Sequence, residues 1–359
     1  MTTPRRILVI GATGAMGQYL VPELSRMGFV VEALALDQPR QQLPNVTYHQ
    51  ANFSKPDVRD HFLASHYDAI VDFMTYGSAS LDTALPRLLD ATDQYIFLSS
   101  CRVFDNRQVP IVESSPRLLD ASDDPQLLAS DDYCIYKARG ENFLRAQPRR
   151  NWTIVRPSTT YSFMRYQLVT LEAPDTVGRA FRNKAVVVPV QAYSIPCSMT
   201  WGGDVGPMIA RLVCNEAALG EDFNVTSSES HPWSVVADYF RDICGLRAVW
   251  VDQQDYLDIL EPDRSRQNGK RWQLIYARLF NRVYDNTKML QATGLEQRNF
   301  RSLYDGLHNE ITRCPKDHPF PNNPRMDDYL RRLGENCCPR ERGPRTPSTQ
   351  PKASVPGTL

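Results

Sequence analysis

Two residues that could carry acid–base chemistry lie four positions apart in the segment DDYCIYKARGE. On a helix, Tyr133 and Lys137 would share one face and point into the same space. A phenol has a pKa of about 10, and a neighbouring ammonium group stabilises the phenolate, which can then act as a general base near neutral pH. Ser99 and Ser100 precede this segment at the expected end of a strand, where a hydroxyl can bond the same substrate oxygen. The pattern Tyr-x-x-x-Lys is common by chance, so a catalytic role for these residues depends on the segments around them.

Three glycines follow a short apolar run in RRILVIGATGAMGQYL. Residues 7–10 are rich in β-branched side chains, which is typical of a strand buried on both faces of a parallel sheet. Helical spacing then links Met16, Leu20, Val21 and Leu24. Gly11, Gly14 and Gly17 therefore lie between a strand and a helix, where backbone N–H groups and the helix dipole can hold a diphosphate. The alternative is that they form only a tight turn.

An acidic residue ends the next predicted strand, FVVEALALD, 20 to 26 positions after the glycines. There Asp37 can accept hydrogen bonds from both ribose hydroxyls of a dinucleotide, and its charge repels a 2′-phosphate. The sequence therefore predicts NAD rather than NADP as cofactor. Arg40 lies close enough to oppose that preference, and Asp37 could instead simply end the strand.

Strand patterns alternate with helical stretches through the first half of the chain. Further strands are expected to end at Asn52, Met74, Ser100 and Pro157. This alternation predicts an α/β fold, a Rossmann-type doubly wound parallel sheet with a smaller C-terminal α/β substrate lobe. We expect an NAD-binding domain over 1–157, with strands returning to it around 195–225, a substrate lobe over 158–335 and a disordered tail over 336–359.

Composition excludes several classes of function. The 359 residues carry a formal net charge of zero, so no general attraction to nucleic acid or to membranes is expected. No apolar run reaches the roughly 20 residues of a membrane helix, and we expect a cytoplasmic protein. Eight cysteines and six histidines lack the spacing of metal ligands, so the cysteines are expected to be reduced thiols and no metal site is predicted.

Taken together, these segments resemble the extended short-chain dehydrogenases/reductases, the family of NAD-dependent sugar-nucleotide epimerases and dehydratases. The resemblance runs from Ile7 to about Leu307. It rests on GATGAMG, Asp37, SSCRVF, YCIYK, TIVRPSTTY, MTWGGDVG, DFNVTSSES and DNTKMLQATGL, in this order.

The resemblance implies a soluble, homodimeric enzyme of polysaccharide biosynthesis that binds NAD and a nucleotide-sugar substrate. It implies a catalytic triad of Ser100, Tyr133 and Lys137, with Lys137 also holding the nicotinamide ribose. It implies cofactor contacts from Gly11, Thr13, Gly14, Ala15, Met16, Gly17, Asp37, Asn52, Phe53, Phe73, Tyr133 and Lys137. Substrate contacts are expected from Arg102, Tyr161 and Arg282.

Departures from the family pattern narrow the reaction. Where 4,6-dehydratases carry Asp-Glu, this chain has Cys101 and Arg102. An arginine stays protonated and cannot exchange protons near neutral pH, so dehydration is disfavoured and Arg102 is expected to bind substrate. Cys101 could act as a base only if its pKa fell.

Other departures concern ligand contacts. Phe104 replaces a tyrosine, Asn52 replaces an aspartate near the adenine, and Cys197 stands near the position of an arginine that contacts the substrate diphosphate. Arg282 could supply that phosphate contact or simply cap a surface.

Aromatic residues after Pro157 could form the walls of the substrate site or pack the core of the smaller lobe. They are Tyr161, Phe163, Tyr166, Trp201 and Trp233. Their positions in the sequence do not separate the two interpretations.

We therefore expect an NAD-dependent epimerase that oxidises a hydroxyl of a nucleotide-activated sugar transiently and returns the hydride. The alternatives are an NAD(P)-dependent dehydrogenase or reductase of a sugar nucleotide, and a non-catalytic dinucleotide-binding protein.

Overall fold

A computed structural model of the chain describes residues 4–39 and 41–334. Its centre is a seven-stranded, fully parallel sheet in the order β11-β6-β5-β4-β1-β2-β3. The strands are β1 (Arg6–Ile10), β2 (Val30–Ala35), β3 (Val46–Gln50), β4 (Ala69–Asp72), β5 (Tyr95–Leu98), β6 (Trp152–Pro157) and β11 (Glu221–Val225). The predicted Rossmann-type sheet is therefore confirmed.

Helices cover both faces of this sheet, as the buried apolar residues of the strands require. One face packs against α1 (Gly17–Arg26), α8 (Gly202–Leu212) and α12 (Thr287–Thr293). The other packs against α2 (Pro56–Leu63), α3 (Leu81–Asp90) and α6 (Tyr133–Arg145). The short helices α4 (Leu118–Ala121) and α5 (Pro125–Ala129) lie in the connection from β5 to α6.

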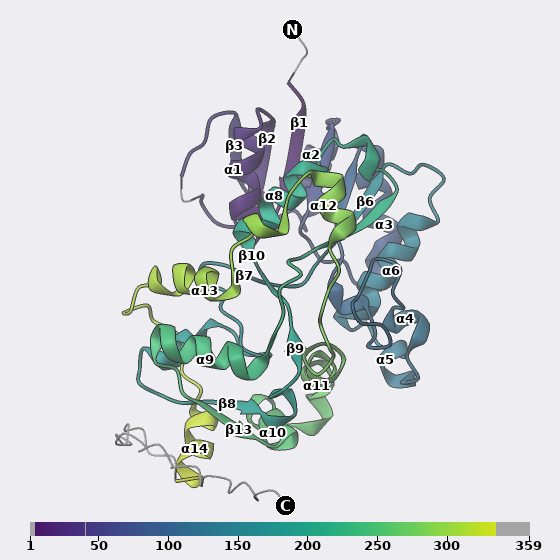
Figure 1. Ribbon diagram of the computed structural model, residues 1–359. Helices are drawn as coiled ribbons and strands as arrows, with labels where there is room; N and C mark the ends of the chain where they lie inside the picture. Colours follow the sequence, from purple (N-terminus) through teal and green to yellow (C-terminus); the bar gives the residue numbers. More distant parts are fainter. Residues whose placement is uncertain (1–3, 40, 335–359) are drawn as a thin grey trace, which may run out of the picture.

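A second lobe lies below the sheet in Figure 1 and has its own apolar core. Its strands β8 (Val186–Pro189) and β13 (Ala248–Val251) pair in parallel. Its helices are α7 (Val177–Ala180), α9 (Trp233–Cys244), α10 (Gln253–Leu260), α11 (Asn268–Gln273), α13 (Leu303–Thr312) and α14 (Pro324–Arg332). This lobe contains both helices and strands, as predicted for the smaller C-terminal α/β unit.

Two short strand pairs lie in the segments that join the sheet to the second lobe. Strand β7 (Thr159–Tyr161) runs parallel to β10 (Met199–Trp201), and β9 (Pro196–Cys197) runs antiparallel to β12 (His231–Pro232). The chain thus passes more than once between the two parts, with β11 returning to the sheet. The proposed domain limits stay a prediction.

Some predictions fall on residues that the structure does not describe. Arg40 and the tail over 336–359, with Cys337 and Cys338, lie outside the described residues. Within 4–39 and 41–334, no helix is long and apolar enough to cross a membrane.

Candidate functional site

A cavity of about 760 Å³ opens at the carboxyl ends of the parallel strands and continues to the second lobe. In open α/β sheets this edge is the usual place of a ligand. The predicted site residues in its lining are Gly11, Thr13, Gly14, Ala15, Met16, Gly17, Asp37, Asn52, Phe53, Phe73, Ser100, Arg102, Tyr133 and Arg282. Lys137 and Tyr161 do not line it.

The glycine loop fits a dinucleotide diphosphate. Gly11 has φ +85°, a conformation that favours glycine, and its N–H donates to the carbonyl of Leu34 at 2.8 Å. A Cβ on Gly17 would lie 2.5 Å from the carbonyl oxygen of Gly11, so only glycine allows α1 to begin this close to the loop. Among the described residues, the N–H groups of Ala15 and Met16 have no main-chain partner. They line the cavity at the N-terminus of α1, where they can bind phosphate oxygens.

Asp37 lies exposed at the rim of the cavity, two residues beyond the end of β2. Asn52 lies beyond β3, and its Oδ1 accepts a hydrogen bond from the N–H of Ser54 at 2.9 Å. Phe53 and Phe73 line the same end of the cavity, on the loops after β3 and β4. These positions fit the adenosine half of a dinucleotide, and the individual contacts stay predictions.

Asp37→Ser tests the predicted preference for NAD over NADP. We expect NAD binding to weaken by roughly 1 to 3 kcal/mol, because hydrogen bonds to a carboxylate are charge-assisted. Titration of both cofactors into the wild-type and variant proteins measures the change. Equal affinities of the wild-type protein for NAD and NADP would contradict the role of Asp37.

The three predicted catalytic residues lie close together, Ser100 just beyond the end of β5 and the other two on α6. Helix α6 begins at Tyr133, and Asp132 caps it by accepting a hydrogen bond from the N–H of Cys134 at 3.1 Å. The hydroxyl of Ser100 bonds that of Tyr133. One turn further along α6, the ammonium of Lys137 lies 5.8 Å from the centre of the Tyr133 ring. Tyr133 and Ser100 thus face the cavity together, with Lys137 behind them.

The pKa shifts of Tyr133 and Lys137 differ in part from those expected from the sequence. Burial raises the pKa of Tyr133, although the Ser100 hydrogen bond and the guanidinium of Arg102 oppose the rise. Burial lowers the pKa of Lys137 to about 8. In this structure the groups that lower the pKa of the phenol are therefore Ser100, Arg102 and Arg165, whereas the sequence predicts that Lys137 lowers it.

A buried carboxylate controls the surroundings of Lys137. The ammonium of Lys137 donates to the carbonyls of Leu98 at 2.6 Å and Met74 at 3.2 Å. The N–H of Met74 in turn donates to Asp72 at 2.8 Å, and the hydroxyls of Tyr76 and Tyr95 donate to the same carboxylate at 2.7 and 2.9 Å. Asp72 thus holds the loop that holds Lys137, and its charge raises the pKa of the lysine against the effect of burial.

Asp72→Asn is expected to move the alkaline limit of activity to lower pH. Burial and the charges of Asp72 and Glu141 set the pKa of Lys137, and Tyr133 and Tyr136 are the phenols that face it. Removing the Asp72 charge lowers this pKa, so the ammonium is lost earlier as pH rises, by about one pH unit. The pH profile of kcat/KM measures the shift. Tyr76→Phe is the control, since it removes one hydrogen bond and keeps the charge; equal profiles for wild type and Asp72→Asn would refute the coupling.

Cys101 and Arg102 lie beside the catalytic group but cannot serve as a dehydratase acid–base pair. Burial raises the pKa of the Cys101 thiol to about 12, and its Sγ lies 3.1 Å from the carbonyl oxygen of Arg156. The guanidinium of Arg102 lies 5.1 Å from the centre of the Tyr133 ring and forms an ion pair with Asp132 at 3.0 Å. Neither side chain can exchange protons near neutral pH.

Two of the residues predicted to contact the substrate have positions or hydrogen bonds in the structure that indicate a structural role. Tyr161 is fully buried in the core of the second lobe and does not line the cavity, a position that indicates packing and does not support the expected substrate contact. Arg282 lines the cavity, but Nε and Nη2 donate to the carbonyls of Ala277, Phe104 and Tyr276. These bonds hold the backbone around the site and leave Nη1 without a hydrogen-bond partner in the described part of the chain.

Most of the aromatic residues considered as substrate walls pack the second lobe. Tyr166 and Trp233 are buried in its core, and Trp201 packs against that core. Trp233 alone of the five lines the cavity, where its indole N–H donates to the carbonyl of Arg278 at 3.0 Å. Core packing is therefore the main role of this set.

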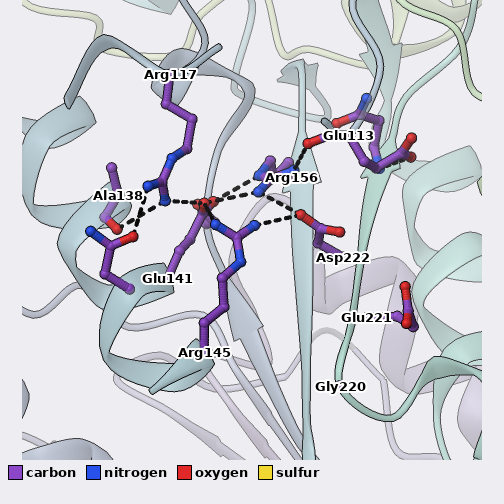
Figure 2. A network of polar contacts seen from close by, with 12 residues as sticks. Glu113, Arg117, Ala138, Glu141, Arg145, Arg156, Gly220, Glu221 and Asp222 are labelled. Atoms are coloured by element: carbon purple, nitrogen blue, oxygen red, sulfur yellow. Dashed lines mark hydrogen bonds and ion pairs between the residues drawn. The ribbon is translucent and has the colours of Figure 1, made fainter. Parts of the chain in front are cut away.

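A buried ion network fixes α6 against the sheet (Figure 2). Glu141, one turn beyond Lys137, accepts from Nε and Nη2 of Arg156 at 2.7 and 2.8 Å and from Nη1 of Arg117 at 3.0 Å. It also accepts a hydrogen bond from Ser99 at 2.5 Å. The network therefore ties the catalytic helix to the strand end that carries Ser100.

Sequence reasoning missed Asp72, Glu141 and Arg278 as site residues. Asp72 and Glu141 could have been found from the sequence. Asp72 lies in an otherwise apolar strand, and Glu141 lies one helical turn after Lys137. A carboxylate that is buried in either place needs a polar partner. Arg278 carries no such signal, because the second lobe brings it to the cavity. Among the described residues, no cluster of histidine, cysteine, aspartate and glutamate could hold a metal ion.

Comparisons with known proteins agree with this geometry. Residues 11–187 match the family model described as NAD(P)H-binding. No protein of curated function matches the chain in sequence.

Solved structures of epimerases share the fold at low identity. Epimerase Mth375 from Methanothermobacter thermautotrophicus has a TM-score of 0.63 at 15% identity, over 86% of this chain and 91% of that chain. The UDP-glucuronic acid 4-epimerase from Bacillus cereus, in complex with UDP-glucuronic acid and NAD, has a TM-score of 0.62 at 14% identity, over 86% and 99%. The Thermus thermophilus UDP-glucose 4-epimerase, in complex with NAD, has a TM-score of 0.60 at 14% identity, over 86% and 100%.

The glycine loop, the parallel sheet and the match over 11–187 lead to one conclusion. Residues 11–187 form an NAD(P)H-binding domain, and the chain shares its fold with the solved sugar-nucleotide epimerases.

Proposed function

We propose that the protein is an NAD-dependent epimerase of a nucleotide-activated sugar. The observation that carries the proposal is the placement of Ser100 and Tyr133, backed by Lys137, on the wall of a cavity that begins at the glycine loop. That cavity is long enough to bring a cofactor and a second ligand together, because its lining runs from Asp37 to the second lobe. The solved epimerases of the same fold support the assignment.

The residues of the chain divide the work as follows. The loop over 11–17 and Asp37 would hold the dinucleotide by its diphosphate and ribose. The chemistry that NAD supplies when bound is the acceptance and return of a hydride. Ser100 would orient the reacting hydroxyl, and Tyr133 Oη, as the phenolate, would take the proton of that hydroxyl. Tyr133 would then give the proton back to the same oxygen.

The surroundings of Tyr133 support a reaction limited to hydride transfer. Loss of water from a keto sugar needs a base for a carbon-bound proton and an acid for the leaving hydroxyl. Cys101 is a buried neutral thiol, and Arg102 is a fixed cation. Neither group supplies the acid or the base, so we expect the product to keep all atoms of the substrate.

Turnover in deuterated water tests this function. With a panel of sugar nucleotides, we expect a product of unchanged mass, no solvent deuterium at the reacting carbon and no net consumption of NAD. Loss of water with deuterium at the neighbouring carbon would indicate a dehydratase, and stoichiometric consumption of NADH would indicate a reductase. A protein that binds NAD and turns over none of these would be a non-catalytic binder. The homodimer and the cytoplasmic location stay predictions.

A further inference from the structure

The half of the cavity beyond Tyr133 carries an excess of positive charge. Four arginines line it: Arg102, Arg165, Arg278 and Arg282. Among its lining residues the carboxylate on this side is Glu172, whose Oε1 accepts a hydrogen bond from Gln167. Although Asp132 pairs with Arg102 from outside the lining, an excess of guanidinium groups over carboxylates around a cavity favours an anionic ligand.

Arg278 is the most unusual of the four. It ends a π-helical turn, η7 (Leu274–Arg278), and its side chain is only 8% exposed. Its Nε donates to the carbonyl of Val169 at 2.7 Å and its Nη1 to the hydroxyl of Thr159 at 2.9 Å. Within the described residues it forms no ion pair, although burial of a charge normally requires one. Short π-helical turns are frequent at functional sites, which fits a guanidinium placed for a ligand.

Arg278 remains charged and faces a second cation. Burial, followed by the charge of Arg102, lowers its pKa to about 10 against the opposing charge of Glu172, so the group is protonated at neutral pH. Arg102 is paired with Asp132, whereas Arg278 has no paired carboxylate in the described part of the chain, so its repulsion from Arg102 costs electrostatic free energy. A bound anion between them would remove that cost.

The position of Arg102 indicates where on the substrate this anion lies. Arg102 stacks at 5.1 Å over the ring of Tyr133, and its backbone N–H donates to the hydroxyl of Ser100 at 3.1 Å. Because Ser100 and Tyr133 are proposed to bind the reacting hydroxyl, we expect the part of the substrate beside Arg102 to be the same sugar ring. Arg165, on the loop after β7, also lines this end and lowers the pKa of Tyr133.

We propose that Arg102 and Arg278 bind a carboxylate on the sugar ring, so that the substrate is the nucleotide derivative of an acid sugar, a uronate. The inference rests on the proposed function and names its substrate class. The carboxylate accepts hydrogen bonds from Arg278, whose backbone carbonyl is fixed by Trp233, and from Arg102, which is fixed by Asp132.

A matched pair of substrates tests the proposal. We expect kcat/KM for UDP-glucuronate to exceed that for UDP-glucose by at least roughly 100-fold, since the two differ only by the carboxylate. Arg278→Gln should lower kcat/KM for UDP-glucuronate much more than that for UDP-glucose and so remove most of this preference, and Arg278→Lys should restore part of it. Arg278→Gln leaves no buried carboxylate unpaired, and thermal unfolding checks that the variant is folded. Arg298→Gln, which changes an exposed arginine paired with Glu296, should keep the wild-type preference.

Two results would overturn the proposal while leaving an epimerase in place. One is equal use of both substrates by the wild-type protein. The other is an equal loss on both substrates in Arg278→Gln, which would assign Arg278 to the diphosphate that the two share.

A second experiment tests the carboxylate site independently of the proposed epimerase function. Binding of free D-glucuronate and D-glucose to the NAD-loaded protein is measured by saturation-transfer NMR. Selective binding of glucuronate that Arg278→Gln abolishes supports the carboxylate site even if neither sugar nucleotide is converted, in which case the epimerase assignment fails alone. Absence of both conversion and glucuronate binding overturns the two proposals together.

Discussion

Tyr133→Phe is expected to reduce turnover by about 10²- to 10⁴-fold, the range for loss of a general acid–base group. The substitution removes one oxygen, which bonds Ser100, and leaves the ring that packs under Arg102 at 5.1 Å and against Tyr136 at 5.4 Å. The fold and the affinity for NAD should therefore stay unchanged. Single-turnover kinetics with a sugar nucleotide, together with NAD titration, separate the chemical step from binding.

A matched tyrosine on the same helix provides the control. Tyr136 lies beside Tyr133 on α6 but does not line the cavity, and Tyr136→Phe should stay within about threefold of the wild type. Lys137→Met should lose both activity and NAD affinity. Full turnover in Tyr133→Phe would place the chemistry elsewhere in the cavity.

The sheet could be predicted because its strands carry strong local signals. The runs that form β1, β4 and β5 are short, apolar and buried on both faces, and turns or helical patterns separate them. The glycine loop could be predicted equally well, since the positive φ of Gly11 favours glycine and a Cβ on Gly17 would clash with the carbonyl of Gly11. In such segments the local sequence and the tertiary structure impose the same requirement.

The substrate half of the site could not be predicted in the same way. Tyr161 and Arg278 are separated by more than a hundred residues, and only the packing of the second lobe decides that Arg278 lines the cavity whereas Tyr161 does not. From the sequence, Arg282 could either contact a phosphate or cap a surface. Its hydrogen bonds to three backbone carbonyls favour a structural role. Side-chain direction in irregular segments depends on contacts between distant parts of the chain, which periodicity does not encode.

Glu141→Gln is expected to lower the free energy of unfolding by about 3 to 5 kcal/mol, because it breaks a buried ion pair from one side. Glu141 and Arg156 are both fully buried, and the guanidinium keeps Asp222 at 2.7 Å as its remaining carboxylate partner. Urea unfolding measures the loss. Glu296→Gln is the matched control, since the pair of Glu296 with Arg298 is exposed and should contribute less than about 1 kcal/mol.

The pH dependence of stability is an independent test of the contribution of the Glu141 carboxylate. Although burial raises it, the Arg156 guanidinium and the hydrogen bonds of the network lower the pKa of Glu141 from 4.5 to about 2. A depressed pKa means that the stabilisation is complete above the unfolded-state value and is lost as pH falls from there through about 2. The wild-type protein should therefore lose stability more steeply than Glu141→Gln over this interval, by about 3 kcal/mol. Parallel curves for the two proteins would mean that Glu141 does not hold the charge of Arg156, and α6 would then need another anchor to keep Tyr133 and Lys137 beside Ser100.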